Sequence, residues 1–89
     1  MEKVVTSTGF ECEIDPDALN DMDLFDCICK LQKGDMMQLP AIFGKLLTEE
    51  DYERLKDHCR TKSGRVPIER ISEELNNIFT GMSGIGKKF

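Results

Sequence analysis

The strongest constraint on the fold of this chain is the spacing of its apolar residues, which repeats with the period of an α-helix along most of the sequence. The clearest example is RVPIERISEELNNIFTG, where Pro67 suits the start of a helix and Gly81 suits its end. Its apolar residues share one broad face: Ile68, Ile71, Leu75, Ile78 and Phe79. A helix with such a face buries it against other elements, so we expect this segment to pack on a core.

Two further helices are predicted in the middle of the chain. In TEEDYERLKDHCRTKSG, Thr48 and Asp51 resemble a capping box, and Gly64 is expected to close the helix. Its apolar stripe consists of Tyr52, Leu55 and Cys59. The preceding MMQLPAIFGKLL predicts a short apolar helix that begins near residues 39–40. Four residues of that segment are expected to fill the core: Met36, Met37, Leu46 and Leu47.

The segment DPDALNDMDLFDCICKLQKG predicts a first long helix. Asp15 is a good N-cap, Pro16 suits the first helical position, and Gly34 ends the helix. Its apolar stripe is Leu24, Phe25, Ile28 and Leu31. The aspartates also suggest a calcium loop, but Leu19 and Asn20 stand where that loop needs an oxygen ligand and a glycine. Helix capping explains these acids better.

The first residues of the chain predict a small β-hairpin over residues 3–14. Two runs typical of strands, residues 3–5 and 10–14, flank a Thr-Ser-Thr-Gly turn. In the second run Phe10, Cys12 and Ile14 alternate with glutamates, which is the pattern of a half-buried strand. An isolated hairpin is marginal, so we expect it to pack its apolar face on the helices.

Together these segments predict a mainly α fold, with about four helices and a short N-terminal hairpin. A chain of 89 residues makes one domain, which we place at residues 1–80, followed by a flexible tail at residues 81–89. No apolar run approaches the roughly 20 residues of a membrane span, and the N-terminus lacks the apolar stretch of a signal peptide. We therefore expect a cytoplasmic protein that does not enter membranes.

The last nine residues, GMSGIGKKF, contain the glycine and lysine spacing of a phosphate-binding P-loop. Such a loop needs a Ser or Thr after its lysine and a helix that follows at once. Here Lys88 follows Lys87, no helix follows, and the preceding ELNNIF reads as the end of a helix. Nucleotide binding is therefore not expected.

The cysteines and the single histidine do not form a recognisable metal or catalytic pattern. The four cysteines are Cys12, Cys27, Cys29 and Cys59. Their spacing is wrong for a structural zinc site, so we expect small buried apolar residues. His58 is expected at the edge of the core, without a Ser or Cys nucleophile, and the carboxylates on solvated helix faces. No enzyme activity, cofactor or metal is predicted.

Charge is distributed unevenly along the chain. The net charge is −5, which argues against nonspecific binding to nucleic acid. Seven acids and no bases lie between residues 11 and 26, whereas six bases and two acids lie between residues 54 and 70. The two regions are either ordinary solvated faces or surfaces that attract one another in self-association. The candidates for such contacts are Asp21, Asp23, Asp26, Arg54, Arg60 and Arg65.

The order of these parts resembles the tail assembly chaperones of long-tailed phages and prophages. The resemblance covers residues 9–80 and rests on LPAIFGKLL, then LLTEEDYERLKDH, a basic linker and GRVPIERISEELNNIF. It implies a small non-catalytic helical protein that coats the aggregation-prone tape-measure protein until tail tube subunits polymerise around it. Such chaperones leave before the virion is complete, and we expect homo-oligomers.

The family often makes a second, longer product by a programmed ribosomal frameshift near the end of the short reading frame. Gly86-Lys87-Lys88 can be encoded by an A-rich run on which a ribosome slips. The hypothesis is that these residues matter through their codons in the messenger RNA, where the frameshift would occur. For contact with the client or with another copy, the candidates are Phe25, Met36, Met37, Phe43 and Phe79. Each of these is equally compatible with a place in the core.

A helix-turn-helix DNA-binding regulator is the alternative function. Two predicted helices flank RTKSGRVP, and bases cluster near this turn. The helix that would enter the groove carries Glu69, Glu73 and Glu74 but only one base, Arg70. Acidic side chains in that position would repel phosphates, so this alternative is less favoured.

Overall fold

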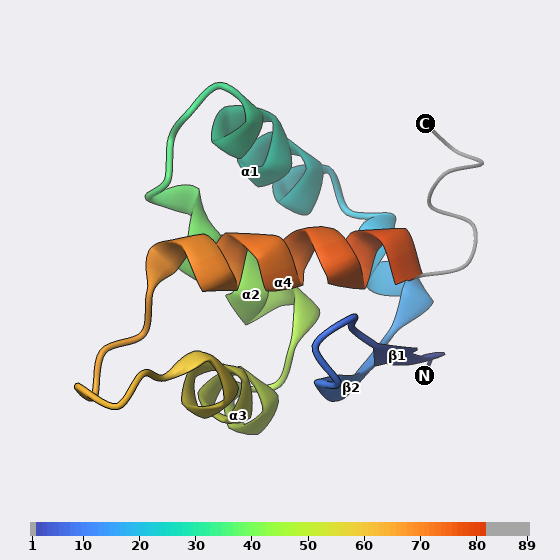
Figure 1. Cartoon of the computed structure of the whole chain (residues 1–89). Helices are drawn as coiled ribbons and strands as arrows, with labels where there is room; N and C mark the ends of the chain where they lie inside the picture. The colour runs from blue at the N-terminus through green and yellow to red at the C-terminus, as the bar shows by residue number, and fades with distance from the viewer. Residues whose placement is uncertain (1, 82–89) are drawn as a thin grey trace.

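The computed structural model describes residues 2–81, and Figure 1 shows their arrangement. The elements, in chain order, are strands β1 (Glu2–Val5) and β2 (Glu11–Ile14), the 3-10 helix η1 (Pro16–Leu19), and helices α1 (Met22–Gln32), α2 (Gln38–Leu46), α3 (Glu49–Cys59) and α4 (Ile68–Gly81). Within this part of the chain the predicted class is confirmed: a mainly α domain with an N-terminal hairpin. The predicted flexible tail and the P-loop-like residues lie, apart from Gly81, outside the described residues.

The hairpin forms much as the alternation predicts. The strands are antiparallel, with Val4 opposite Cys12 and Glu2 opposite Ile14, so the buried residues of both strands share one face. The turn is closed by a hydrogen bond from the Thr6 backbone N–H to the Phe10 carbonyl. Phe10 lies in this turn, one residue before β2, and is nevertheless buried. The hairpin therefore has one apolar face to set against the helices.

The prediction of one long helix after the hairpin was wrong, because the segment contains two helices. Asp15 caps the short η1 by accepting from the Asp17 N–H at 2.9 Å, and Asp21 caps α1 by accepting from the Asp23 N–H at 2.9 Å. Between them, Asn20 has non-helical backbone angles. Short side chains such as Asp compete for backbone N–H groups and so begin a helix more readily than they continue one.

Helix α3 starts as predicted, with the Thr48 hydroxyl accepting from the Asp51 N–H at 3.1 Å. It ends earlier than expected, at Cys59, because Arg60 has extended backbone angles. Gly64, predicted to close this helix, closes a separate turn, with its N–H bonded to the Thr61 carbonyl and its φ at +89°. Since Gly64 carries no Cβ, it adopts this left-handed conformation without steric cost.

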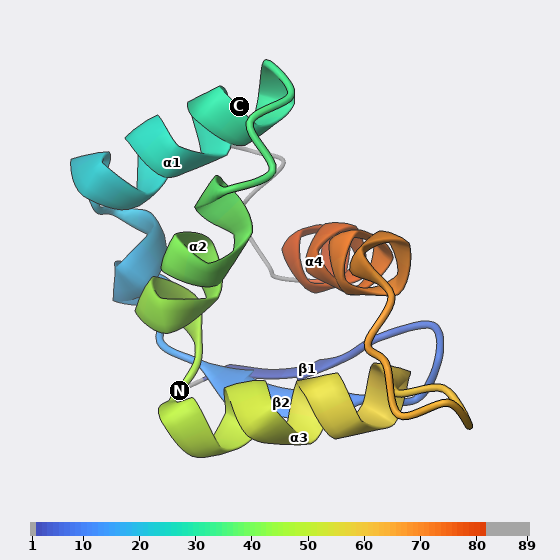
Figure 2. The same ribbon diagram turned by 90° about the vertical axis from the view of Figure 1, so that its left-hand side faces the viewer.

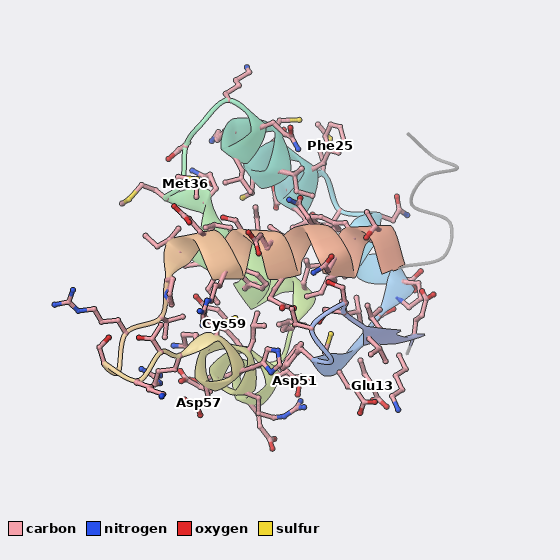
Figure 3. All side chains as sticks on the ribbon, viewed as in Figure 1. Glu13, Phe25, Met36, Asp51, Asp57 and Cys59 are labelled. Atoms are coloured by element: carbon pink, nitrogen blue, oxygen red, sulfur yellow. The ribbon has the colours of Figure 1, made fainter. Side chains whose placement is uncertain are left out.

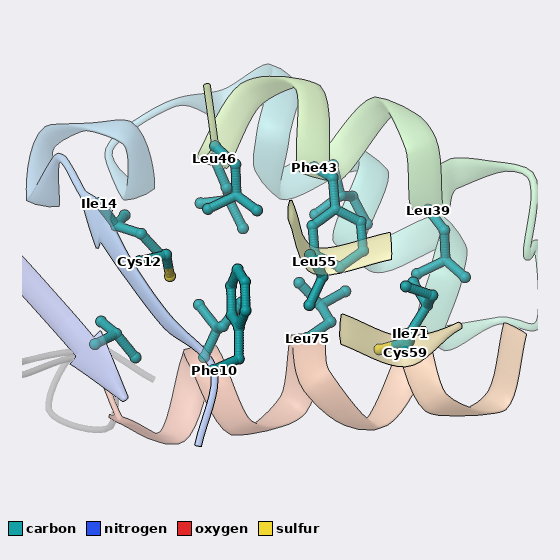
Figure 4. Packing of buried hydrophobic residues seen from close by; sticks show 14 of the residues in the cluster. Phe10, Cys12, Ile14, Leu39, Phe43, Leu46, Leu55, Cys59, Ile71 and Leu75 are labelled. Carbon is teal, nitrogen blue, oxygen red and sulfur yellow. The ribbon is translucent and has the colours of Figure 1, made fainter. Parts of the chain in front are cut away.

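One core joins the hairpin to the helices. Figures 1 and 2 show α4 crossing the molecule, with α2 behind it and α3 and the hairpin below, while α1 packs on α2. In Figure 4 the side chains of Phe10, Phe43, Leu55 and Leu75 point into the space between these elements. Phe43 is completely buried, and its ring stacks on that of Tyr52 at 5.4 Å. No helix within residues 2–81 combines the length and the apolar character needed to cross a bilayer.

Candidate binding groove and a polar cluster

Some large apolar side chains stay outside the core, and three of them gather in one place. Met37 is 84% exposed, Ile68 61% and Met36 44%. They line a hollow of about 350 Å³, here called the apolar groove, which lies where the beginnings of α2 and α4 meet the middle of α3. The groove residues are Met36, Met37, Leu39, Pro40, Tyr52, Lys56, Val66, Ile68 and Ile71. An apolar depression bordered by exposed apolar side chains is typical of an interaction site.

The methionine wall of the groove is held by the turn between α1 and α2. Gly34 has a φ of +102° and ends α1, after which the Asp35 N–H returns to the Lys30 carbonyl. The Asp35 carboxylate accepts from the Met37 N–H at 3.1 Å and from Gln38 Nε2 at 2.9 Å. The first turn of α2 is thereby fixed with the methionine side chains outside. The expectation that Met36 and Met37 fill the core was wrong.

The opposite wall is the start of α4. Ile71 faces the core and is 7% exposed, whereas Ile68, one turn earlier, is 61% exposed. The prediction that Ile68 shares the buried face was therefore wrong, because α3 ends at Cys59 and the chain returns through a loop. Val66, in that loop, packs partly against the core and completes this side of the groove.

The rim next to α3 carries one cationic group. The Lys56 ammonium lies 4.7 Å from the centroid of the Tyr52 ring and 2.9 Å from Glu53 Oε1. The hydrogen bond to Glu53 raises the pKa of Lys56, so the group stays charged at neutral pH. Apart from Lys56, the residues that line the groove have no charged side chain, and their surface is mostly aliphatic, methionine and tyrosine. Such a site suits apolar side chains better than a polar small molecule.

The five residues predicted to contact a client or another copy are placed differently by the structure. Met36 and Met37 line the groove, whereas Phe43 is fully buried and belongs to the core. Phe25 and Phe79 are half-buried, on α1 and α4. Figure 3 shows Phe25 on α1, well away from Met36 at the start of α2. The five side chains therefore do not form one surface, and residue type alone did not reveal Ile68 and Val66 as part of the groove.

The two charged regions meet at Arg54, which donates to the Glu11 carbonyl at 3.1 Å, but their other parts are separated. Residues 15–21 and the loop at residues 60–66 are far apart in both Figure 1 and Figure 2. Several predicted contact residues are paired within the chain: Asp21 lies 3.9 Å from Lys45, Arg54 2.7 Å from Asp51, and Arg60 3.2 Å from Asp57. The other three, Asp23, Asp26 and Arg65, are exposed.

A buried carboxyl group on α4 was missed by the sequence-based reasoning. Glu74 is only 3% exposed, although we expected all carboxylates on solvated faces. The Thr8 hydroxyl donates to Glu74 Oε1, and Thr8 Oγ1 also lies 2.9 Å from His58 Nε2 and 3.1 Å from Thr6 Oγ1. These four residues, here called the polar cluster, connect the hairpin turn to α3 and α4. Glu74 lies one turn after Ile71 and next to Leu75. Because its side chain is charged, it is not part of the apolar pattern, so the periodicity does not indicate that it is buried.

The donation from Thr8 to Glu74 determines how the other hydrogens of the polar cluster are placed. Thr8 has a single hydroxyl hydrogen, and this hydrogen is directed at Glu74. His58 Nε2 must therefore donate to Thr8, and the Thr6 hydroxyl must do the same. A histidine that donates to a hydroxyl is not poised to remove its proton, so this arrangement is not that of an activated nucleophile. Within residues 2–81, Glu74 Oε2 has no hydrogen-bond partner.

The four cysteines differ in how far they are buried. Cys12 and Cys59 are in the core, as expected, whereas Cys27 and Cys29 on α1 are half-buried. Burial, followed by the nearby Asp51 carboxylate, raises the pKa of Cys12 to about 11, and burial also raises the pKa of Cys59. Both buried thiols therefore stay protonated at neutral pH. Among residues 2–81 there is no group of three or more His, Cys, Asp or Glu side chains that could hold a metal ion.

Comparison of this chain with models of protein families, with curated proteins and with solved structures finds no match in any of the three.

Proposed function

We propose that this protein is a tail assembly chaperone of a long-tailed phage or prophage, which binds the tape-measure protein and keeps it soluble without catalysing a reaction. The resemblance of residues 9–80 to that family suggests the role. The observation that carries the proposal is the apolar groove, with Met36, Met37 and Ile68 exposed around an apolar floor. An amphipathic helix binds a groove of this kind through side chains one turn apart.

The size of the groove sets the affinity that one copy can reach. Each client side chain of Leu, Ile or Phe type that is fully buried contributes about 1.5–3 kcal/mol before the cost of association is subtracted. With about 350 Å³ available, one copy accommodates few such side chains and binds weakly. Many copies along one long helical client gain from multivalency, which is why the proposal includes a homo-oligomer.

The opposite charges at the two ends of the molecule support contacts between successive copies. In this part of the proposal, the acidic end around Asp23 and Asp26 meets the Arg65 loop of the next copy. Such a contact is heterologous and does not close, so it produces rows of copies along the client. Partners that follow from the family are the tail tube protein and a longer, frameshifted form of the chain. The chaperone would act in the host cytoplasm and be absent from the virion.

The test is co-production of the chain with a tape-measure protein, with the soluble fraction of the latter as readout. Two variants, Met37→Glu and Ile68→Glu, place a charge in the groove. Both positions are at the start of a helix, where an acid interacts favourably with the helix dipole, so both variants should fold. Met22→Glu is the matched control, because Met22 is 66% exposed, also begins a helix, and lies outside the groove.

We expect the wild type and Met22→Glu to keep the tape-measure protein soluble, and the two groove variants to lose most of this effect. If the groove variants solubilise the tape-measure protein as well as the wild type, the groove is not the binding site. If the wild type itself leaves the tape-measure protein insoluble, the proposed function is wrong.

A helix-turn-helix regulator is favoured by one observation, the exposed basic loop between α3 and α4 with Lys62 and Arg65. Against it, the exposed charged residues in the first two turns of α4 are Glu69, Arg70 and Glu73, and Ile68 belongs to the apolar groove. A gel-shift assay at low salt distinguishes the two functions. A DNA complex that weakens steeply with salt would favour the regulator.

A further inference from the structure

The backbone groups of the hairpin divide into those that face the other strand and those that face away from it. In an antiparallel pair, residues that exchange hydrogen bonds with the partner strand alternate with residues whose N–H and C=O groups point outward. The Thr6 N–H donates to the Phe10 carbonyl across the turn, at 2.9 Å. Two residues along the ladder, Val4 and Cys12 therefore exchange hydrogen bonds as well. The residues with outward groups are Lys3 and Val5 on β1, and Glu11 and Glu13 on β2.

The outer edge of β2 is occupied by α3. Arg54 of α3 donates to the outward-facing carbonyl of Glu11 at 3.1 Å. The same guanidinium donates to the Asp51 carboxylate at 2.7 Å, and its carbon lies 5.3 Å from the centroid of the Phe10 ring, so it is held in place. In both Figure 1 and Figure 2, α3 lies on the β2 side of the hairpin. A further strand could add to β2 only by displacing Arg54.

The outer edge of β1 has no such cover. Within residues 2–81, no hydrogen bond reaches the outward backbone groups of Lys3 or Val5. Val5 is 53% exposed. In Figure 1 no helix of the described chain lies beyond β1 on the side away from β2. A strand edge with donors and acceptors facing outward is a template for one more strand.

The usual protections of an edge strand are weak in β1. Proline, a bulge or an outward lysine commonly prevents one edge from pairing with another. β1 contains no proline, and its pairing with β2 runs from Glu2 to Val5 without a bulge. The Lys3 ammonium lies 3.6 Å from Glu11 Oε1 across the hairpin. The charge of Lys3 is therefore partly compensated within its own hairpin and repels a second strand less.

A second copy of β1 fits this edge in one register. About a twofold axis, β1 pairs antiparallel with itself, and the contact is isologous. With Val4 opposite Val4 of the second copy, Lys3 faces Val5 of that copy on both sides of the axis, and each such pair exchanges two hydrogen bonds. With Lys3 opposite Lys3, like charges would face each other, which is destabilising. With Val5 opposite Val5, Lys3 would face Ser7, which lies in the turn outside the strand.

We propose that β1 pairs antiparallel with β1 of a second copy in the register centred on Val4, so that the two hairpins join into one continuous sheet. In this pair the side chain of Val5 lies beside the aliphatic stem of Lys3 from the other copy, which covers apolar surface that a single copy exposes. Strands of four residues bury far less than the roughly 1,000 Å² of a stable interface, so the pair forms at about millimolar protein rather than in dilute solution. The contact is closed and does not use the charged ends, so it is independent of the head-to-tail contact and of the tape-measure protein.

The test uses ¹H–¹⁵N spectra of the full chain at about 0.5 M salt, where electrostatic contacts between copies are screened. As the protein concentration rises from tens of micromolar to about 1 mM, the amide signals of Lys3 and Val5 should shift and diffusion should slow. In a mixture of labelled and unlabelled protein, Val4 should show an NOE between the Hα atoms of the two copies, because their Cα atoms lie about 4.5 Å apart in this register.

Three variants assign the contact to the outer edge of β1. Val5→Pro removes one outward N–H group, and proline is tolerated at such an edge position, so the hairpin should still form. We expect this variant to associate at least about tenfold more weakly than the wild type. Val5→Thr keeps the N–H group and the branched side chain, so it is the matched control and should associate as the wild type does. Glu13→Pro removes the equivalent outward N–H group from β2 and should also leave association unchanged.

The proposal is overturned if Val5→Pro associates as strongly as Val5→Thr, or if Val4 shows no NOE between copies at the highest concentration. Because the NOE is measured on the wild type, it decides the outcome even where Val5→Pro does not fold. Slow hydrogen exchange at the Val5 amide in dilute protein would also overturn the proposal, since the edge would then be covered within one chain. Equal weakening by Glu13→Pro would place the contact on β2 and contradict the assigned edge.

Discussion

At the scale of single residues, Glu74 connects three elements through one carboxyl group. Its Oε1 accepts from Thr8, which is in turn hydrogen-bonded to His58 and Thr6, while Oε2 has no partner in the described part of the chain. Desolvating a carboxyl group is costly, so the hydrogen bond from Thr8 matters more here than it would at the surface. The polar cluster therefore fixes how the hairpin turn sits on α3 and α4.

Thr8→Val removes the hydroxyl that links these elements and leaves a buried acceptor unsatisfied. We expect a loss of about 1–3 kcal/mol in the free energy of unfolding, measured by urea denaturation. Ser7→Ala in the same turn is the control, since Ser7 is exposed and its hydroxyl accepts only a surface bond from Asn77. A Thr8→Val variant no less stable than Ser7→Ala would contradict the role given to the cluster.

Cys12 provides a pH-dependent prediction. Burial raises the pKa of Cys12 from 9.0 to about 11, which lowers its thiolate fraction at pH 8 by about 100-fold. We expect thiol reagents to modify Cys27 and Cys29 first and Cys12 only as fast as the protein unfolds. The folded state holds this proton more tightly, so the contribution of Cys12 to stability should be constant below about pH 9 and be lost between pH 9 and 11. Rapid labelling of Cys12 in the folded protein would contradict this.

At the scale of elements, replacing each of two glycines by alanine is expected to change the stability of the protein in opposite directions. Gly44 lies within α2 with nothing within 4 Å of where a Cβ would be, so Gly44→Ala should stabilise the protein by about 0.5–1 kcal/mol. Gly64 has equal space but a φ of +89°, so Gly64→Ala should destabilise it by about 1 kcal/mol. Urea denaturation of the two variants checks both signs. A stabilising Gly64→Ala would mean that the turn before α4 is not as described.

The sequence predicted which helices and strands form better than it predicted where they end and which of their residues are exposed. Periodicity located α2, α3, α4 and the hairpin, because each buries one continuous face. It could not show the break at Asn20, since two capping aspartates look like a single acidic helix start. It also placed Ile68 and Met37 inside, because a periodic pattern gives the face of a residue but not whether another element covers it.

The candidate site was predictable only in part. Met36 and Met37 were named as contact candidates on residue type, and both line the apolar groove. Phe43 was named on the same ground and is core, because the stacked ring of Tyr52 and the surrounding helices enclose it. The burial of Glu74 could not be predicted, since its hydrogen-bond partner Thr8 lies 66 residues earlier in the chain.

At the scale of the whole molecule, the separation of opposite charges predicts salt-dependent self-association. The Arg65 loop and the acidic end around Asp23 lie at opposite ends, so copies can attract one another head to tail. Sedimentation at low salt should show a mass that rises with concentration, and Lys62→Glu/Arg65→Glu should reduce it to the monomer. Glu49→Lys/Glu50→Lys reverses two exposed charges at the start of α3 and serves as a comparison. Association that is unchanged at 0.5 M salt would contradict an electrostatic contact.

The central claim is that the apolar groove binds helical, apolar segments of a client. The affinity of the protein for such segments tests this claim most directly. Fluorescence anisotropy with labelled amphipathic peptides from a tape-measure protein would compare the wild type, Met37→Glu/Ile68→Glu and Met22→Glu. The account predicts that the groove variant binds at least about tenfold more weakly, a loss of about 1.4 kcal/mol, while Met22→Glu binds as the wild type does. Equal affinity of all three proteins, or no binding by any of them, would contradict it.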